Sequence, residues 1–446
     1  MASNYFPTVA RPSTEDLKQF YVGKDIADVP KPAVVLDVAI IKRHCQAMLE
    51  TVRALNVGFR VHVKSHKTSQ IARLQVGDDG DTNFIASTIP EIETLVPLLK
   101  SLQENGRQIN VLYGIPLVPS QVPRLATLAR ELGEKSITVM IDHPDQLNYL
   151  EKFHSIAGFP ACTFVKVDAG YHRAGLPPAM LNKNGLLEKL AKTEESGHAI
   201  FLGVYSHSSL SYGGKTPEEA MSHLAGEIES CKEAIKYHSN LFPKDRKLVV
   251  SVGATPQVVS SKNLLQGNAT SQQDALMEQL HDPSVKVELH AGVYPLLDMQ
   301  QVGTNAVSNL GKIEDEIAIS VVAEVCSVYN NGERSKPEAL VAAGTLALGR
   351  EPCQSYPGWG VVSSWRQESI SSRLIVGRIS QEHGILTWDG DSSDAQIPLR
   401  IGQAVRIYPN HACVTGALYD WYLVVDSSQE SEGSKIVDVW TRVGGW

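Results

Sequence analysis

The feature that most constrains the fold is a repeated pattern of strand-like and helix-like segments between residues 59 and 292. Each repeat has a short run rich in β-branched residues, a loop, and a longer stretch with apolar residues at helical spacing. Such alternation is typical of a parallel sheet covered by helices, either open or closed into a barrel. Eight runs, and no Gly-rich dinucleotide fingerprint after the first, favour a parallel (β/α)8 TIM-type barrel. The runs span residues 59–64, 83–88, 109–113, 137–142, 163–168, 201–207, 248–252 and 285–289.

Beyond about residue 295 the pattern changes to short strand-like segments separated by turn-rich ones. This change predicts a C-terminal all-β domain. The first 30 residues, rich in proline and polar residues, lead into the strand-like segment PAVVLDV. We expect this lead-in to pack on the β-domain. The predicted organisation is therefore a barrel over residues 31–295 and a β-domain over residues 1–30 and 296–446.

Composition narrows the class of protein. A chain of 446 residues with 43% hydrophobic and 20% charged residues is ordinary for two folded domains. Its net charge of −8, with no compensating basic cluster, argues against nucleic acid as a partner. No run of 18 apolar residues and no signal-like N-terminal segment occurs, so we expect no membrane span and a cytoplasmic location. Six cysteines without a CxxC pair are expected to be thiols.

At the end of the first predicted barrel strand stands a segment with several basic residues, RVHVKSHK over 60–67. Strand alternation places His62 and Lys64 on one face and two valines on the other. If the valines pack outward on the helices, His62 and Lys64 point into the barrel. Burial favours a neutral amine, which Schiff-base chemistry requires. A solvated lysine at the rim is the alternative interpretation of Lys64, and Lys67, expected to face solvent, is its rival.

Several motifs together resemble one family. HVKSHK is similar to the cofactor-lysine segment of the fold-type III pyridoxal-phosphate enzymes, which include eukaryotic D-serine dehydratases and D-threonine aldolases. This resemblance implies an alanine-racemase-like barrel with pyridoxal 5'-phosphate on Lys64. The other matching segments, in the family's order, are IASTIPEIE, VDAGYHRAG, GVYSHSSLSY, SVGATP, ELHAGVYPLLD, EHG and PNHAC.

The resemblance also implies roles for residues after the fifth and sixth strands. Arg173 would hold the phenolate oxygen of the cofactor by a charge-assisted hydrogen bond. Tyr205 would meet the pyridine nitrogen and Tyr212 the phosphate end, although such tyrosines are often core residues. A tyrosine rather than a carboxylate at the nitrogen predicts an unprotonated ring, which is a weaker electron sink. Elimination would then need help at the leaving group.

Phosphate binding is expected from backbone amides after the seventh and eighth strands, where such barrels usually bind phosphate. Glycines there allow a phosphate oxygen to approach closely, although each could be an ordinary loop glycine. The candidate residues are Gly253, Ala254, Thr255, Gly292, Val293 and Tyr294. Glu288 and Asp298 also match positions of the family's segments, but no role can be given to them from sequence.

The last motif is the sequence PNHAC near the C-terminus. In a strand, His411 and Cys413 would point to the same side and could bind zinc with open positions, as a catalytic metal needs. The alternative is a chance pair on a strand face. D-threonine aldolases carry aspartate instead of the cysteine, so Cys413 favours zinc and the dehydratase branch. One departure is Ala342-Ala343-Gly344, where many relatives have Asp-Ala-Gly.

The resemblance implies a zinc-assisted lyase that converts a D-amino acid, D-serine, to pyruvate and ammonia by α,β-elimination. Lys64 would act as the base, and zinc on His411 and Cys413 would polarise the hydroxyl group. Alternatives on the same site are a D-threonine aldolase and a 3-hydroxyaspartate dehydratase. A non-catalytic pyridoxal-phosphate-binding protein is an alternative of a different class, and a dinucleotide-dependent oxidoreductase is a more distant one. The resemblance also implies a homodimer.

Overall fold

The computed structural model describes residues 12–266, 270–363, 365, 373–390, 395–429 and 433–446. The chain forms two compact units, each described here by itself. The barrel unit comprises Arg43–Pro295, Gln301–Gly311 and Val443–Trp446. The β unit comprises Leu296–Gln300, Lys312–Arg442 and the described part of Met1–Lys42. Residues 1–11 of the expected lead-in lie outside the described residues.

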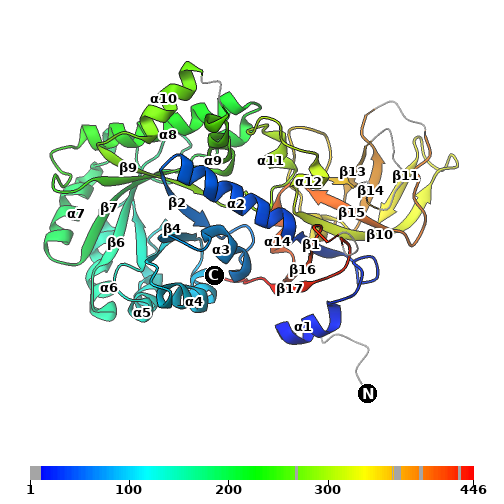
Figure 1. Ribbon diagram of the computed structural model, residues 1–446, viewed down its shortest axis with the longest axis horizontal. Coiled ribbons are helices and arrows are strands. Elements are labelled where there is room, and N and C mark those ends of the chain that lie inside the picture. Colours follow the sequence, from blue (N-terminus) through cyan, green and yellow to red (C-terminus); the bar gives the residue numbers. More distant parts are fainter. Residues whose placement is uncertain (1–11, 267–269, 364, 366–372, 391–394, 430–432) are drawn as a thin grey trace. The chain divides into compact units, whose positions relative to one another are not determined.

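The barrel unit contains a closed ring of parallel strands in sequential order from β2 to β9, with helices around it (Figure 1). The last strand pairs with the first: in the β2–β9 register Gly58 lies opposite Glu288. The predicted eight-stranded barrel is therefore confirmed. Its strands are β2 Gly58–His62, β3 Thr82–Ala86, β4 Ile109–Pro116, β5 Ile137–Ile141, β6 Ala161–Lys166, β7 Ala199–Tyr205, β8 Leu248–Val252 and β9 Val285–Ala291.

Several helices of the barrel unit begin at a threonine that caps the first turn. Thr216 accepts a hydrogen bond from Glu219 N (3.2 Å) at the start of α8, and Pro217 fills the first helical position. The α-helices are α2 Val38–Ala54, which begins in the β unit, α3 Ser69–Val76, α4 Ile89–Glu104, α5 Val122–Leu132, α6 Leu150–Ala157, α7 Leu186–Glu195, α8 Pro217–Tyr237, α9 Thr255–Ser260 and α10 Ser271–Leu280. The 3-10 turns are Pro119–Gln121, Pro144–Tyr149, Pro178–Met180, Lys183–Gly185, Leu210–Gly213 and Ser261–Leu265.

A polar layer lies inside the barrel. Arg60 Nε is 2.7 Å from Glu288 Oε1, and both side chains are almost fully buried. Asn83 Nδ2 and Ser251 Oγ donate to the same carboxylate at 3.0 and 2.8 Å, and Arg60 also donates to Asn110. Glu288, for which the sequence suggested no role, is thus the carboxylate that neutralises Arg60. An apolar layer of Ile85, Leu112, Met140, Phe164 and Tyr205 forms a second buried cluster.

The β unit is built on a nine-stranded sheet with the order β11-β14-β13-β12-β15-β10-β1-β16-β17. The predicted C-terminal β-domain is confirmed. Strand β1 (Ala33–Asp37) pairs antiparallel with β10 and parallel with β16, so it belongs to this sheet although we expected residues 31–42 in the barrel. The other strands are β10 Ile319–Tyr329, β11 Glu338–Val341, β12 Gly360–Val362, β13 Leu374–Ile379, β14 Gly384–Trp388, β15 Ala404–Pro409, β16 Trp421–Val425 and β17 Asp438–Thr441.

Two apolar clusters hold the β unit together. The larger lies among β10 to β15 and includes Val321, Val376 and Ile407. In the smaller, Leu17 from the first helix packs with Leu423 and Val439, so the described part of the lead-in does pack on the C-terminal strands. The α-helices outside the barrel are α1 Thr14–Tyr21, α11 Met299–Gly303, which ends in the barrel unit, α12 Ile313–Glu316, α13 Thr345–Leu348 and α14 Ala412–Ala417. Among the described residues, no helix has the length and apolar character needed to span a membrane.

Candidate active site

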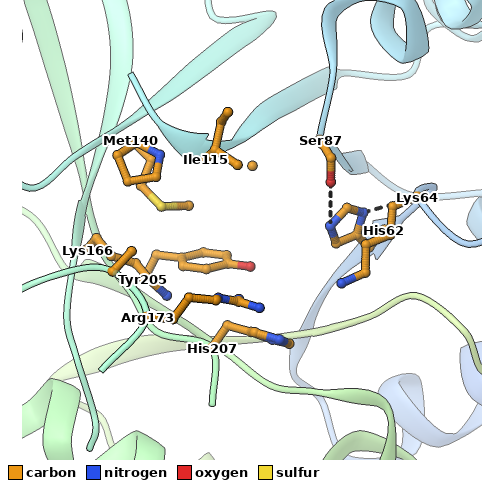
Figure 2. Close-up of a pocket in the computed structure, with 12 residues that line it drawn as sticks. His62, Lys64, Ser87, Ile115, Met140, Lys166, Arg173, Tyr205 and His207 are labelled. Carbon is orange, nitrogen blue, oxygen red and sulfur yellow. Dashed lines mark hydrogen bonds between the residues drawn. The ribbon is translucent and has the colours of Figure 1, made fainter. Parts of the chain in front are cut away.

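A cavity of about 340 Å³ opens in the barrel unit among residues at and just beyond the carboxyl ends of the strands. Figure 2 shows His62 and Lys64 on one side of this pocket, with Tyr205, Arg173 and His207 across from them. Parallel barrels concentrate functional groups at this end because the loops after all the strands meet there. The lining residues are His62, Lys64, Ser87, Gly114, Ile115, Pro116, Met140, Lys166, Arg173, Ala174, Tyr205 and His207.

Lys64 lies just beyond β2, because the strand ends at His62, two residues earlier than predicted. The lysine nonetheless lines the pocket, and its backbone N–H donates to His62 Nδ1 at 3.3 Å. The following turn is fixed by buried His66, whose ring nitrogens lie 3.2 Å from Thr68 Oγ1 and 3.0 Å from Gln75 Oε1. The turn, rather than strand alternation, therefore sets the position of Lys64.

The prediction that Lys67 faces solvent is wrong. Its Nζ lies 2.8 Å from Glu91 Oε1, and its side chain is only 15% exposed. Glu91 is buried and also accepts hydrogen bonds from Ser87 N (2.8 Å) and Thr88 Oγ1 (3.1 Å). This ion pair offsets the cost of burying the carboxylate, and Lys67 is not among the residues that line the pocket. Of the two candidate lysines, only Lys64 lines it.

Arg173 reaches the pocket from the loop after β6. Asp168 shapes this loop by accepting hydrogen bonds from Gly170 N (3.0 Å), His172 N (2.9 Å) and His172 Nδ1 (2.8 Å). Partial burial opposes the charge on Asp168, but the hydrogen bonds from His172 and Gly170 hold the pKa of this carboxyl below its usual value. An ionised Asp168 therefore organises the loop that carries the guanidinium.

Tyr205, at the end of β7, is held between aromatic and cationic neighbours. Its ring stacks on His290 with centroids 4.4 Å apart and planes 4° from parallel. Lys166 Nζ lies 4.6 Å from the centre of the same ring. Burial raises the pKa of Tyr205, so its hydroxyl stays protonated and can donate a hydrogen bond. Tyr212, predicted to serve the same site, is half-buried in the 3-10 turn Leu210–Gly213 and does not line the pocket.

The histidines of the pocket region are neutral. Burial, followed by the positive charges nearby, lowers the pKa values of His62, His207 and His290 well below the usual value. His207 Nδ1 lies 2.6 Å from Gly253 O, which connects the pocket wall to the loop after β8. His207 lies in the segment GVYSHSSLSY that matches the family, but the sequence suggests no role for it. Strand alternation points to His207, because it follows Tyr205 by two residues and would face the same side.

Lys166 is a site residue that sequence analysis missed. It ends β6, two residues after inward-facing Phe164, so strand alternation could have found it. Its Nζ is buried and has no hydrogen-bond partner among the described residues. Burial lowers the pKa of Lys166 to about 8, opposed by the nearby carboxyl of Glu227, whose own pKa burial raises to about 7. Glu227 Oε1 accepts a hydrogen bond from Ser206 Oγ at 3.0 Å.

The loops after β8 and β9, predicted to bind phosphate, are tied to each other. Thr255 Oγ1 accepts hydrogen bonds from Gly292 N (3.4 Å) and Val293 N (3.2 Å). Gly253 has φ +140°, and a Cβ there would lie 2.5 Å from His290 O, so only glycine fits. The Tyr294 side chain is fully buried against Phe59, which leaves only its backbone available to a ligand.

In the β unit, His411 and Cys413 are not on a strand, so that prediction is wrong. β15 ends at Pro409, and His411 is the N-cap of α14, which begins at Ala412. The helix starts here because the carboxylate of fully buried Asp298 accepts a hydrogen bond from Ala412 N at 2.8 Å. The His411 and Cys413 side chains nevertheless interact, because His411 is an N-cap residue with extended backbone (φ −139°, ψ 102°) and Cys413 lies in the first turn that it caps.

We call residues 411–413 the His411–Cys413 loop. Two carboxylates, those of Asp298 and Glu351, lie near its imidazole. Glu351 Oε2 lies 3.8 Å from His411 Nδ1. Burial disfavours the charged imidazole, but the Cys413 side chain and the carboxylates of Asp298 and Glu351 outweigh it and raise the pKa of His411 to about 9. Within the described residues, no group of three or more His, Cys, Asp or Glu side chains is placed to hold a metal ion. The His411–Cys413 loop thus offers an imidazole and a thiol as possible metal ligands, with carboxylates nearby.

Comparisons with known proteins agree with this architecture. The family profile described as "Alanine racemase, N-terminal domain" matches residues 36–268, and that described as "Putative serine dehydratase domain" matches residues 318–425. Among solved structures, D-threo-3-hydroxyaspartate dehydratase from Delftia sp. has a TM-score of 0.73 at 24% identity, covering 95% of this chain and all of that chain. An alanine-racemase-like protein from Idiomarina loihiensis has a TM-score of 0.72 at 23% identity, covering 94% and 99%.

The fold and these matches define an alanine-racemase-like barrel enzyme with an appended β-domain. D-serine dehydratase of Schizosaccharomyces pombe is 35% identical over 97% of this chain and 96% of that protein. The Saccharomyces cerevisiae D-serine dehydratase is 30% identical over 97% of this chain and its own full length. The chain belongs to the D-serine dehydratase family, a family of lyases, and the predicted family and enzyme class are confirmed.

Proposed function

We propose that this chain is a pyridoxal-phosphate- and zinc-dependent dehydratase that converts D-serine to pyruvate and ammonia. The observation that carries the proposal is the pocket at the strand ends, where Lys64 faces Arg173 and the protonated hydroxyl of Tyr205. The two D-serine dehydratases named above are similar in sequence to this chain over 97% of its length. Substrate, cofactor and metal are the parts of this proposal that experiments must test.

The residues of the pocket fit the phosphorylated cofactor. Lys166 and Arg173 supply positive charge, the two lining histidines are neutral, and the buried Lys166 Nζ lacks a hydrogen-bond partner among the described residues. Such a lining suits an anion with several acceptor atoms. Lys64 would carry the cofactor, Arg173 would bind its phenolate oxygen and Tyr205 its ring nitrogen. The phosphate group would be bound by backbone amides of the segments 253–255 and 292–294, where Gly292 N and Val293 N would exchange their bonds to Thr255 Oγ1 for bonds to phosphate oxygens. Tyr212 is a further predicted contact.

Pyridoxal phosphate, when bound, supplies an electron sink that makes the α-hydrogen of an amino acid acidic. The chain must then move that proton, and the Lys64 amine is the pocket base for this step. Tyr205 donates a hydrogen bond through its hydroxyl group and does not lose the proton, because burial raises the pKa of this hydroxyl. His62 and His207 are uncharged and add no competing positive charge beside Lys64. Arg173 fixes the orientation of the bound molecule through the loop that Asp168 organises.

The His411–Cys413 loop fits zinc. An imidazole and a thiolate are ligands that zinc prefers, and two protein donors leave positions open for water or substrate. The metal would supply Lewis-acid assistance to a hydroxyl leaving group, which is poor without it. Two solved variants of a D-threo-3-hydroxyaspartate dehydratase replace a histidine and a cysteine two positions apart, and the cysteine variant is described as the metal-free form. That spacing matches His411 and Cys413.

The second candidate function is the same site acting on another substrate. Relatives at lower identity are a D-threo-3-hydroxyaspartate dehydratase (26%) and a D-threonine aldolase from Arthrobacter sp. (23%). Cys413 favours the dehydratase, because the aldolase branch was expected to carry aspartate at this position. Incubating the enzyme with D-serine, D-threonine and D-threo-3-hydroxyaspartate, and measuring pyruvate, acetaldehyde and oxaloacetate, separates the three. Acetaldehyde without pyruvate would contradict the proposal.

The homodimer and the cytoplasmic location stay predictions. Light scattering of the purified protein across a concentration series tests the first. Imaging of a tagged chain tests the second.

A further inference from the structure

Three segments of the β unit converge at the His411–Cys413 loop. They contribute Asp298 and Gln300, then Glu351 to Cys353, and finally Asn410 to Cys413. Gln300 N donates to Asn410 O (3.1 Å), and Gln300 Nε2 donates to Pro352 O (2.8 Å). Asn410 Nδ2 donates to Glu351 O at 2.9 Å and to Gly358 O at 2.7 Å. These bonds fix the backbone of Glu351 beside the residue that precedes His411.

The two carboxylates in this cluster do different work. Asp298 is fully buried and its Oδ2 is bound to Ala412 N, so it holds the backbone at the start of α14. The Glu351 side chain is 44% exposed and lies with Oε2 3.8 Å from His411 Nδ1. A partly exposed carboxylate can change rotamer at little cost, and only 3.8 Å separates its oxygen from the ring nitrogen. Glu351 is therefore the carboxylate that can reach the imidazole ring.

The ring of His411 has one nitrogen turned into the protein. Nδ1 is buried and forms no hydrogen bond within the described residues, whereas the side chain as a whole is 31% exposed. The accessible edge of the ring is thus the one away from Nδ1. A buried N–H without an acceptor is costly, so an acceptor at this position is expected.

Resting on the proposed zinc site, we propose that Glu351 is a positioning residue that accepts a hydrogen bond from His411 Nδ1–H. This bond would fix the tautomer that leaves the Nε2 lone pair free for the metal, next to the Cys413 thiolate. Carboxylates that bind the far nitrogen of a metal-ligating histidine commonly orient the ring and raise its basicity. The absence of a preassembled set of three donors among the described residues favours this indirect role over direct ligation by Glu351.

The experiment measures zinc binding by the purified full-length enzyme without substrate, by competition with a chromophoric chelator. We expect Glu351→Ala to raise the zinc Kd about 10- to 100-fold. Glu351→Gln keeps an acceptor oxygen without the charge and should recover part of that loss. The matched control is Glu324→Ala, which removes a carboxylate that is 50% exposed and 3.5 Å from Lys31 in the same unit. An unchanged Kd in Glu351→Ala would overturn the inference.

The cobalt(II)-substituted protein supplies the second readout. If Glu351 acts only through His411, the d–d and thiolate charge-transfer bands of Glu351→Ala at saturating cobalt should match those of the parent. A shift that indicates a lost oxygen ligand would overturn the positioning role in favour of direct ligation. His411→Ala separates this inference from the proposed function: if the parent chain binds no zinc that His411→Ala removes, the metal proposal itself fails. If the parent binds zinc and only Glu351 has no effect, the inference alone fails.

Discussion

The barrel pocket and the His411–Cys413 loop place their functional groups by different means. In the barrel, His62, Lys166 and Tyr205 stand at the last positions of β2, β6 and β7, so closure of the sheet brings them together. In the β unit, His411 is the N-cap of the short helix α14 that follows β15, and Cys413 lies in its first turn. Their loop is held by hydrogen bonds to residues far away in sequence, such as that from Ala412 N to Asp298. The barrel pocket therefore depends on strand pairing, and the His411–Cys413 loop depends on a few polar contacts.

The first prediction tests whether the barrel pocket depends on a single amine. Lys64→Ala should remove the visible absorbance of the lysine-bound cofactor and lower turnover on the order of 10⁴-fold, because the variant lacks both the covalent attachment and the base. Absorbance spectra and a coupled pyruvate assay measure the two effects. Lys67→Met is the comparison variant: it should lower stability, because it leaves buried Glu91 without its cation, but it should keep the cofactor absorbance, because Lys67 does not line the pocket. Absorbance that survives in Lys64→Ala and disappears in Lys67→Met would reverse the assignment.

The same contrast explains what could be predicted from sequence. The eight strands were predictable because parallel barrel strands are short apolar runs between helical segments, and the inward direction of His62 followed from alternation. Lys166 and His207 obey the same alternation and could have been found. The paths of the β-domain loops could not be derived this way, because Asp298 and Glu351 approach His411 only through long-range hydrogen bonds. Treating the His411–Cys413 segment as a strand failed because the Asp298 carboxylate starts a helix there.

The second prediction concerns the polar layer of the barrel, where a buried arginine neutralises a buried carboxylate. Arg60→Met should lower the free energy of unfolding by about 3–5 kcal/mol, because it leaves the buried carboxylate of Glu288 without its cation. Denaturant unfolding followed by circular dichroism measures this. The double variant Arg60→Met, Glu288→Leu removes both charges and should recover much of the loss. If Arg60→Met alone costs under about 1 kcal/mol, the pair does not stabilise the barrel.

The third prediction tests the other side of the comparison. Cys413→Ala should abolish tight zinc binding and lower turnover by about 100-fold, since Lewis-acid assistance is worth several kcal/mol, while cofactor absorbance remains. Metal analysis, the spectrum and the pyruvate assay distinguish these effects. Cys326→Ala, which changes an exposed thiol of the same unit, should leave all three unchanged. Loss of cofactor absorbance in Cys413→Ala would show that the two sites are not independent.

The fourth prediction, with the weakest effect, concerns the protonation of Glu227, whose carboxyl group lies near Lys166. Burial raises the pKa of Glu227 from 4.5 to about 7, so the folded chain binds this proton more tightly than the unfolded chain. By linkage, the contribution of this group to stability is fully present below pH 4.5 and is lost as the pH rises towards 7. Glu227→Gln keeps the neutral shape and should remove that loss, so its unfolding free energy should change less over this pH interval. Glu219→Gln, an exposed residue of the same helix, is the control. Parallel pH profiles for the parent and Glu227→Gln would mean that Glu227 stays ionised beside Lys166 throughout, as one partner of an ion pair rather than as a neutral acid.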